Sequence, residues 1–154
     1  MRAIVQRVTS GSVRDKDSEF SSSIGDGLVL LLGIHRNDTE AEAKKMAEKI
    51  ANLRIFNDTE GKMNLSLLDC PGYDVLAVSN FTVYGDSKKS RRPSFTESAP
   101  FDKGRELFDA FVGYLRAFGF KVPTGAFGAD MSVALTNDGP VTVVVDVDAA
   151  SARP

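Results

Sequence analysis

Short apolar runs, together with partly alternating apolar and polar positions, predict the β-strands of this chain. Residues 2–8 alternate in this way, which is typical of a half-buried strand, and residues 10–12 (Ser-Gly-Ser) are expected to end it. Residues 28–34 are apolar at almost every position, as in a central strand that is covered on both faces. Further strands are predicted at residues 19–24, 74–83, 131–136 and 141–147.

Two segments change to a helical period. Thr39 is followed three positions later by Glu42, a capping box in which both side chains satisfy free backbone donors at a helix start. Apolar residues then recur at helical spacing and predict a helix at about 40–53. A second apolar stripe predicts a helix at about 101–118. Residues 84–100 are rich in Ser, Lys, Arg and Pro, and a loop of that length is usually functional or disordered.

The length of 154 residues suits one domain, which we expect to span residues 1–147, followed by a frayed polar tail at 148–154. The pattern is α/β, with more strands than helices. Apolar residues make up 42% of the chain and charged residues 26%, and the formal net charge is −2. This balance argues against a general coat for nucleic acid, so any RNA contact requires a local basic patch.

The chemistry available to this chain is narrow, because it has one histidine and one cysteine. Neither a metal site built from these residue types nor an internal disulfide is expected, and the single thiol fits a reducing, cytoplasmic location. His35 is expected to be a hydrogen-bonded or surface side chain, and Cys70 an inert thiol. The start of the chain lacks a signal layout, and its longest apolar run is far shorter than the roughly 20 residues that cross a bilayer, so no membrane association is expected.

Two polar segments remain as candidates for a site. The first, Ser79-Asn80-Phe81-Thr82, follows a buried strand, and hydroxyl and N–H groups at a strand end can bind a carbonyl oxygen. The alternative is a strand that fades into a loop, with Ser and Thr bonded to the backbone. The second segment contains four cations, which are either solvated surface charges or contacts for a phosphate backbone. These cations are Lys88, Lys89, Arg91 and Arg92.

The segment Asn137-Asp138-Gly139-Pro140-Val141-Thr142 separates the last two predicted strands. Taken alone, it favours a hairpin turn, because Asn, Asp, Gly and Pro are strong turn formers. A Gly-Pro bond also has a reduced trans preference and can adopt an unusual backbone shape. The hexapeptide alone leaves both interpretations open.

Several motifs, in their order along the chain, resemble the D-aminoacyl-tRNA deacylases, and the resemblance extends from end to end. It rests on Met1–Val8, Gly61–Ser66, Ser79–Val83, Arg92–Phe95, Thr124–Met131 and Asn137–Thr142. The resemblance implies a homodimeric hydrolase that needs no cofactor and cleaves the ester between a D-amino acid and the 3′-terminal adenosine of tRNA. It also implies a layered α/β/β domain whose sheet curls towards a barrel, with active sites at the dimer interface.

The resemblance further implies how L-amino acids are excluded. In the family the Gly-Pro bond is cis, and its turn enters the active site of the partner subunit. Carried over to this chain, the carbonyls of Gly139 and Pro140 would hold the α-amino group and leave no room for an L side chain. Glycine has no side chain, so glycyl-tRNA mischarged on tRNA(Ala) is expected to be a further substrate.

The resemblance also implies roles for single residues. The N–H groups of Phe81 and Thr82 would bind the scissile carbonyl, and the hydroxyls of Ser79 and Thr82 would shape the pocket. Arg7 would brace the Gly-Pro turn, and Phe127 and Met131 would lie beside the adenosine. The substrate-binding set is completed by Asn80, Asn137, Gly139 and Pro140, and the acceptor-stem phosphates would be bound by Lys88, Lys89, Arg91 and Arg92.

This chain departs from the family motif Ser-Gln-Phe-Thr-Leu at two positions, where it has Asn80 and Val83. Val for Leu is a modest change of packing. Asn is one methylene shorter than Gln, so a hydrogen bond made by the family Gln is either lost or rerouted. Activity survives if that bond is structural, whereas rate or specificity changes if it touches the substrate.

Thr82 is disfavoured as a nucleophile, because its motif contains no general base. Attack by water with help from the ribose 2′-hydroxyl fits a chain that is poor in acid–base residues. Two other functions stay open: a related editor with a trans Gly-Pro bond and a wider pocket that accepts some L-amino acids, and a non-catalytic module that binds RNA ends.

Overall fold

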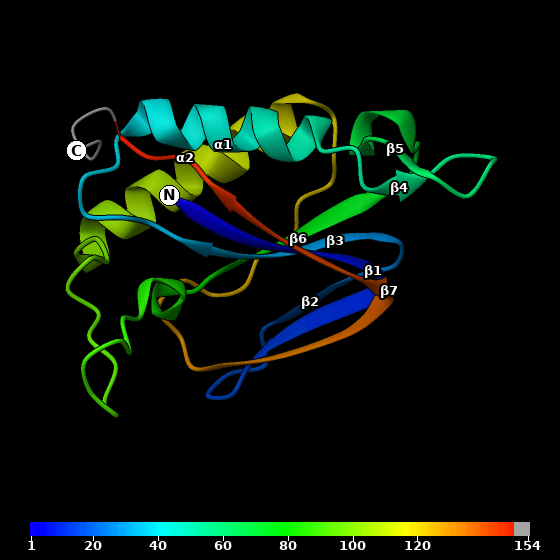
Figure 1. Cartoon of the computed structure of the whole chain (residues 1–154). Helices are drawn as coiled ribbons and strands as arrows, with labels where there is room; N and C mark the ends of the chain where they lie inside the picture. The colour runs from blue at the N-terminus through cyan, green and yellow to red at the C-terminus, as the bar shows by residue number, and fades with distance from the viewer. Residues whose placement is uncertain (150–154) are drawn as a thin grey trace.

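Strand β3 (Gly27–Gly33) lies in the middle of a five-stranded mixed sheet (Figure 1). The other strands are β1 (Arg2–Asp15), β2 (Ser21–Ile24), β6 (Asp74–Ser79) and β7 (Met131–Asp146). In the computed structural model, which describes residues 1–149, β3 pairs in parallel with β6 and antiparallel with β1. Both β2 and β7 pair antiparallel with β1.

Two helices, α1 (Glu40–Asn52) and α2 (Phe101–Ala117), pack on each other and cover one face of the sheet (Figure 1). Both predicted helices are therefore confirmed to within one residue at their ends. Thr39 and Glu42 form the predicted capping box, in which the Thr39 N–H donates to Glu42 Oε2 over 2.7 Å. The short elements are β4 (Phe56–Asn57), β5 (Met63–Leu65), and the 3₁₀ helices η1 (Leu67–Asp69) and η2 (Phe81–Tyr84).

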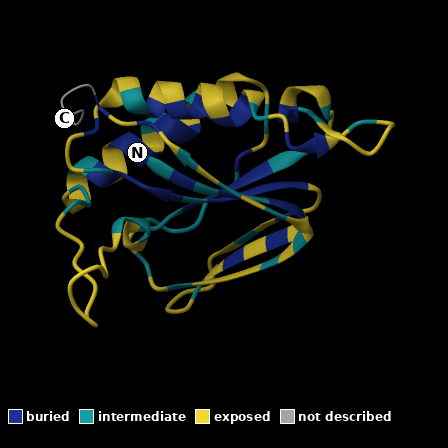
Figure 2. Ribbon diagram, viewed as in Figure 1, coloured by how far each residue is buried: buried dark blue, intermediate teal, exposed yellow. Residues whose placement is uncertain are grey.

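The side chains of β3 alternate between two hydrophobic cores. Leu28, Leu30 and Leu32 belong to the core beneath the helices and are buried. Val29 points the other way and packs in a second core with Leu76 of β6. The prediction of a central strand covered on both faces is confirmed, because every residue of β3 is buried except Leu31, which is partly buried (Figure 2).

Strand β1 is longer than the sequence pattern predicts. The expected break at residues 10–12 is wrong, because the chain continues as a strand to Asp15. Irregular pairing with β7 between Gln6 and Ser10 bends β1, and its second half packs over β3. Gly11 permits this approach, since a Cβ atom there would lie 2.5 Å from Cγ2 of Val29. The result is the expected layered α/β/β domain with a curled sheet.

The two strands predicted at 131–136 and 141–147 are parts of one strand, β7. Its first half pairs with residues 10–15 of β1 and its second half with residues 2–6. Both halves therefore run in the same direction, and the hairpin interpretation is wrong. Residues 138–141 form a bulge opposite Arg7, and the Gly139–Pro140 peptide bond within it is cis, as the resemblance implies.

Strand β6 ends at Ser79, so the predicted extension of this strand to residue 83 is wrong. The Asn80 N–H still donates to the Leu32 carbonyl over 2.8 Å, as a further strand residue would. The Asn80 side chain then accepts a hydrogen bond from the Thr82 N–H and turns the chain into η2. This local side-chain bond replaces strand pairing.

The remaining predicted elements are a weak strand, a long loop and the end of the chain. Strand β2 occupies the second part of the weak strand predicted at 19–24. The loop predicted at 84–100 is confirmed except at Tyr84, which ends η2; residues 85–100, all of them described, contain no helix or strand. Of the predicted tail, Asp148 is exposed and Ala149 is buried, and 150–154 lie outside the described residues. Within residues 1–149, no helix is long and apolar enough to span a membrane.

Gly33, at the end of β3, allows η2 to pack closely against the sheet. A Cβ atom at this position would lie 2.1 Å from Cγ2 of Val83 and 3.0 Å from the ring of Tyr84. Val83 is β-branched and stiff, so Gly33→Ala is expected to displace η2. We expect it to lower the free energy of unfolding by about 1–3 kcal/mol, as measured by urea denaturation.

Gly113→Ala is the matched control for this substitution. A Cβ atom at residue 113 meets no atom within 4 Å and lies in α2, so the variant should gain up to about 1 kcal/mol from helix propensity. If Gly33→Ala is as stable as the wild type within about 0.5 kcal/mol, the close contact does not hold η2 in place.

Candidate active site

A cleft of about 530 Å³ opens where the carboxyl end of β6 meets the start of α2. Its walls come from the β6–η2 corner, from residues 99–104, and from residues 127–133, which lead into β7. Such strand ends are where α/β sheets commonly bind ligands. Six of the predicted site residues line it together: Ser79, Asn80, Phe81, Thr82, Phe127 and Met131.

The η2 turn carries backbone donors beside the cleft. As the first residue of η2, Phe81 cannot donate within that helix, and its N–H has no acceptor among the residues that the structure describes. The Thr82 N–H donates to Asn80 Oδ1 over 3.2 Å, and the Thr82 hydroxyl donates to the same oxygen over 2.5 Å. Ser98 supports the turn, because its hydroxyl donates to the Phe81 carbonyl over 2.9 Å. One donor is thus free, and the second is engaged by a side chain.

The cleft holds few acid–base groups. Asp130 is the one ionisable side chain among the lining residues, all of which are described, and its carboxylate pairs with Lys16 over 3.0 Å. Burial raises the pKa of the Cys70 thiol, and the charge of Asp69 adds to the shift, in line with an inert thiol. Within residues 1–149, no three His, Cys, Asp or Glu side chains gather into a metal site. The cleft can therefore bind and orient a polar group but offers Thr82 no neighbouring base.

Aromatic rings form part of the cleft wall. The ring of Phe127 packs edge-on against Phe101, with 5.2 Å between centroids, and Phe81 packs in the same way against Phe95. Phe81 and Phe101 are 59% and 56% exposed, so their rings are free to contact a ligand. Phe101 is not among the predicted site residues, because a phenylalanine in an amphipathic helix has the same pattern as a core residue.

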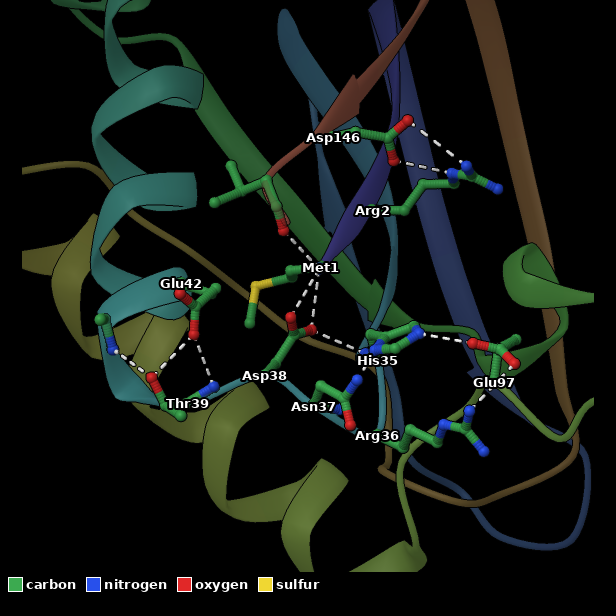
Figure 3. Close-up of polar contacts among 12 residues, drawn as sticks. Met1, Arg2, His35, Arg36, Asn37, Asp38, Thr39, Glu42, Glu97 and Asp146 are labelled. Carbon is green, nitrogen blue, oxygen red and sulfur yellow. Dashed lines mark hydrogen bonds and ion pairs between the residues drawn. The ribbon is translucent and has the colours of Figure 1, made fainter. Parts of the chain in front are cut away.

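His35 has a structural position, as the sequence predicts (Figure 3). Its Nε2 lies 2.7 Å from Glu97 Oε2, and its Nδ1 accepts a hydrogen bond from the Asn37 N–H over 3.1 Å. Arg36 adds an ion pair to Glu97, with 3.5 Å between Nη2 and Oε1. These contacts tie the end of the 85–100 loop to the end of β3, beside the cleft.

Asp38 is buried beside these contacts and stabilises the same region after β3. Its buried carboxylate accepts hydrogen bonds from the Met1 α-ammonium over 2.8 Å and from the His35 N–H over 2.7 Å (Figure 3). A buried charge requires such partners. Burial, together with the charge of Asp38, raises the pKa of Tyr84 at the end of η2, so its hydroxyl stays protonated. The Tyr84 ring also packs edge-on against His35, which connects this corner to η2.

The predicted basic segment lies in the loop that projects below the domain (Figure 1). The backbones of Asp86 and Ser94 exchange hydrogen bonds of 2.8 and 2.9 Å and close the base of this projection. The four basic side chains are exposed, and within the described part of the chain they form no ion pair. They are Lys88, Lys89, Arg91 and Arg92.

The bulge of β7 lies outside the cleft of the same chain. Arg7 is buried, and its Nε donates to the Asp138 carbonyl over 2.8 Å, so it contacts the turn as expected. The Asn137 side chain closes the bulge through hydrogen bonds to the backbone of residue 141. Gly139 and Pro140 are exposed and line no part of the cleft. A single chain therefore does not bring the two predicted motifs together.

Comparisons with known proteins agree over nearly the whole chain. A family model described as D-Tyr-tRNA(Tyr) deacylase matches residues 4–146. The D-aminoacyl-tRNA deacylase of Roseiflexus sp. (strain RS-1) is 55% identical over 146 residues, which cover 95% of this chain and 93% of that protein.

Two solved structures share the fold. One, described as c-Myc DNA Unwinding Element Binding Protein, has a TM-score of 0.87 and 38% identity and covers 97% of this chain and 100% of its own. The other, described as a probable eukaryotic D-amino acid tRNA deacylase, has a TM-score of 0.79 and 20% identity and covers 95% and 98%. At that identity the second likeness bears on the fold alone. Because the family model and a close relative both span almost all of it, this chain belongs to the D-Tyr-tRNA(Tyr) deacylase family.

Proposed function

We propose that this protein hydrolyses the ester between a D-amino acid and the 3′-terminal adenosine of tRNA and releases both products. The observation that carries the proposal is the cleft at the β6–η2 corner, where the free Phe81 N–H stands beside exposed aromatic rings. An aminoacyl ester presents a carbonyl oxygen and a nucleobase, which match these two features. Membership of the family supports the same substrate.

The backbone of η2 stabilises the reacting carbonyl. The N–H groups of Phe81 and Thr82 donate to the carbonyl oxygen, on which negative charge develops as the ester is attacked. The hydroxyls of Ser79 and Thr82 shape the pocket around the carbonyl, and Phe127 and Met131 lie beside the adenosine. This assignment uses the residues that line the cleft.

Water attacks the carbonyl carbon, with the ribose 2′-hydroxyl of the substrate assisting. A bond forms between the water oxygen and the carbon, the bond to the ribose 3′-oxygen breaks, and the water proton ends on that 3′-oxygen. Two observations support a substrate-assisted reaction. The Thr82 hydroxyl donates to an amide oxygen, which is not a base, and Asp130, the one carboxylate that lines the cleft, is exposed and pairs with Lys16. An aminoacyl ester is labile, so positioning contributes most of the acceleration.

Selection for D-amino acids depends on a homodimer in which the β7 bulge of one subunit enters the cleft of the other. The Gly139 and Pro140 carbonyls then hold the α-ammonium group and exclude an L side chain, while glycine from glycyl-tRNA(Ala) still fits. The exposure of both residues, and their place outside their own cleft, support this arrangement. The bond from Arg7 to the Asp138 carbonyl keeps the bulge rigid enough for exclusion.

The projecting loop binds the acceptor stem of tRNA through Lys88, Lys89, Arg91 and Arg92. Exposed cations that form no ion pair with any residue from 1 to 149 are suited to phosphate contacts. Because aminoacyl-tRNA is made and used in the cytoplasm, we place the protein there. No cofactor enters this scheme.

The first prediction concerns chirality. We expect purified protein to release tyrosine from D-Tyr-tRNA at least about 100-fold faster than from L-Tyr-tRNA, a difference of about 2.7 kcal/mol in activation free energy. Glycyl-tRNA(Ala) should be hydrolysed as well. The measurement is the loss of labelled aminoacyl-tRNA with time.

Each other outcome of this assay is informative. Equal rates on D-Tyr-tRNA and L-Tyr-tRNA contradict exclusion by the bulge. Salt-dependent binding without hydrolysis of either substrate contradicts an enzyme and favours the RNA-end-binding module. Buffer without protein controls for spontaneous hydrolysis of the ester.

The second prediction tests the cross-subunit site by mixing two inactive variants. Phe81→Pro removes the free N–H of η2, and the extended backbone of Asn80 (φ −150°, ψ 95°) suits a following proline. Gly139→Val damages the bulge, because residue 139 has a φ of +140° and a Cβ there would lie 2.7 Å from Cγ2 of Val141. Each variant alone should be nearly inactive.

Reassociated mixtures should recover about one quarter of wild-type activity, since half of the dimers are mixed and each of these has one intact site. Sedimentation of both variants controls for dimer formation. If mixing restores nothing although mixed dimers form, the site does not combine a cleft and a bulge from different subunits.

The third prediction concerns the basic segment. Replacing Lys88, Lys89, Arg91 and Arg92 by Gln should raise KM for D-Tyr-tRNA about 10-fold near 0.1 M salt, with kcat little changed. It should also reduce the slope of log KM against log salt by about 0.7–0.9 per lost phosphate contact. The matched control replaces four other exposed lysines by Gln and so makes the same change of net charge: Lys44, Lys45, Lys49 and Lys62. Equal effects of both sets would mean that only net charge matters.

A further inference from the structure

We propose that Asn80 is a positioning residue whose side chain accepts the hydrogen bond of the Thr82 N–H in the free protein. The substrate carbonyl must then displace the Asn80 side chain before it can bind this second donor. The inference rests on the proposed function, because it uses the binding of the ester carbonyl at η2. It concerns the one position in the Ser79–Thr82 segment at which this chain departs from the family motif.

The two proposed donors at η2 differ in whether they already have a hydrogen-bond acceptor. The Phe81 N–H is free within the described residues, whereas the Thr82 N–H already donates to Asn80 Oδ1 over 3.2 Å. The Thr82 hydroxyl donates to the same oxygen over 2.5 Å, which fixes the Asn80 side chain above the turn. A carbonyl that enters the cleft can therefore bind the Phe81 N–H directly. It can bind the Thr82 N–H only after it has displaced the Asn80 side chain.

The length of the Asn side chain explains this arrangement. An Asn oxygen readily reaches the N–H two residues further along and closes a compact ring. Gln carries one more methylene, and its oxygen is less suited to closing that ring. The Asn80 N–H donates to the Leu32 carbonyl over 2.8 Å, and this bond ties the backbone of the residue to the end of β3.

Displacement of the Asn80 side chain exchanges one hydrogen bond of the Thr82 N–H for another. The lost bond reduces the binding free energy of the substrate. The cost therefore appears in KM, whereas kcat, which starts from the complex with the carbonyl already in place, changes little. A variant that leaves the Thr82 N–H free should bind substrate more tightly. A carboxylate at residue 80 should hold the N–H more strongly and repel the developing oxyanion.

The test is a pair of substitutions with opposite expected signs. We expect Asn80→Gln to lower KM for D-Tyr-tRNA by about 2- to 10-fold at unchanged kcat, from the net value of one hydrogen bond. We expect Asn80→Asp to lower kcat/KM at least about 10-fold, since a charged acceptor binds about twice as strongly. A purely structural capping role predicts the reverse order, because Asp caps as well as Asn and Gln does not.

The same changes at exposed Asn52, in α1 and away from the cleft, serve as controls and should leave both constants unchanged. Thermal unfolding of each variant shows whether the fold is intact. If Asn80→Gln leaves KM unchanged or raises it, or if Asn80→Asp is as active as the wild type, the proposal is wrong.

A second measurement does not depend on the reaction. The exchange rate of the Thr82 amide proton, followed by NMR in the unliganded protein, should rise about 2- to 10-fold in Asn80→Gln, while that of Phe81 stays the same. Absence of deacylase activity in the wild type, combined with this exchange pattern, would reject the proposed function but retain the Asn80–Thr82 bond. An unchanged Thr82 exchange rate would overturn the inference itself.

Discussion

Strand β3 imposes the constraint on which the rest of this structure depends, because it is hydrogen-bonded along both edges and buried on both faces. Its side chains fill two cores at once, so β1 and β6 must lie beside it and the two helices must cover one side. Removing apolar surface from water on both faces of one strand stabilises the layers together. The curled half of the sheet then closes over the second face, where Gly11 makes room.

The end of β3 determines the geometry of the candidate site. The Leu32 carbonyl binds the Asn80 N–H, and Gly33 gives η2 the space to pack against the sheet. Beyond it, His35 and Asp38 tie the long loop and the chain start to the same corner. Donors that must meet a carbonyl oxygen within a few tenths of an ångström need such a rigid support. The site is therefore built on the core rather than on a mobile loop.

The chemistry that follows from this support is unusual in needing so few reactive side chains. The cleft contains backbone N–H groups, hydroxyls and aromatic rings, with Asp130 already paired to Lys16. Under the proposed function, positioning and oxyanion stabilisation replace a protein nucleophile. D- and L-amino acids are distinguished because the β7 bulge of the partner subunit leaves no room for an L side chain. Small changes in donor availability, such as the one at Asn80, then have direct effects on substrate binding.

The sequence by itself determined the features whose signals are local. The capping box at Thr39 and the apolar stripes predicted both helices, the continuous apolar run predicted β3, and the scarcity of His and Cys limited the possible chemistry. Order and spacing of motifs also indicated the family. Only the tertiary structure decided that β1 runs through residues 10–12, that residues 131–146 form one strand, and that β6 ends at Ser79. The first two outcomes depend on backbone hydrogen bonds between distant segments, which leave no periodic trace in the local sequence. The third depends on a bond between close neighbours, Asn80 and Thr82, and the apolar pattern of the strand does not show that this bond replaces strand pairing.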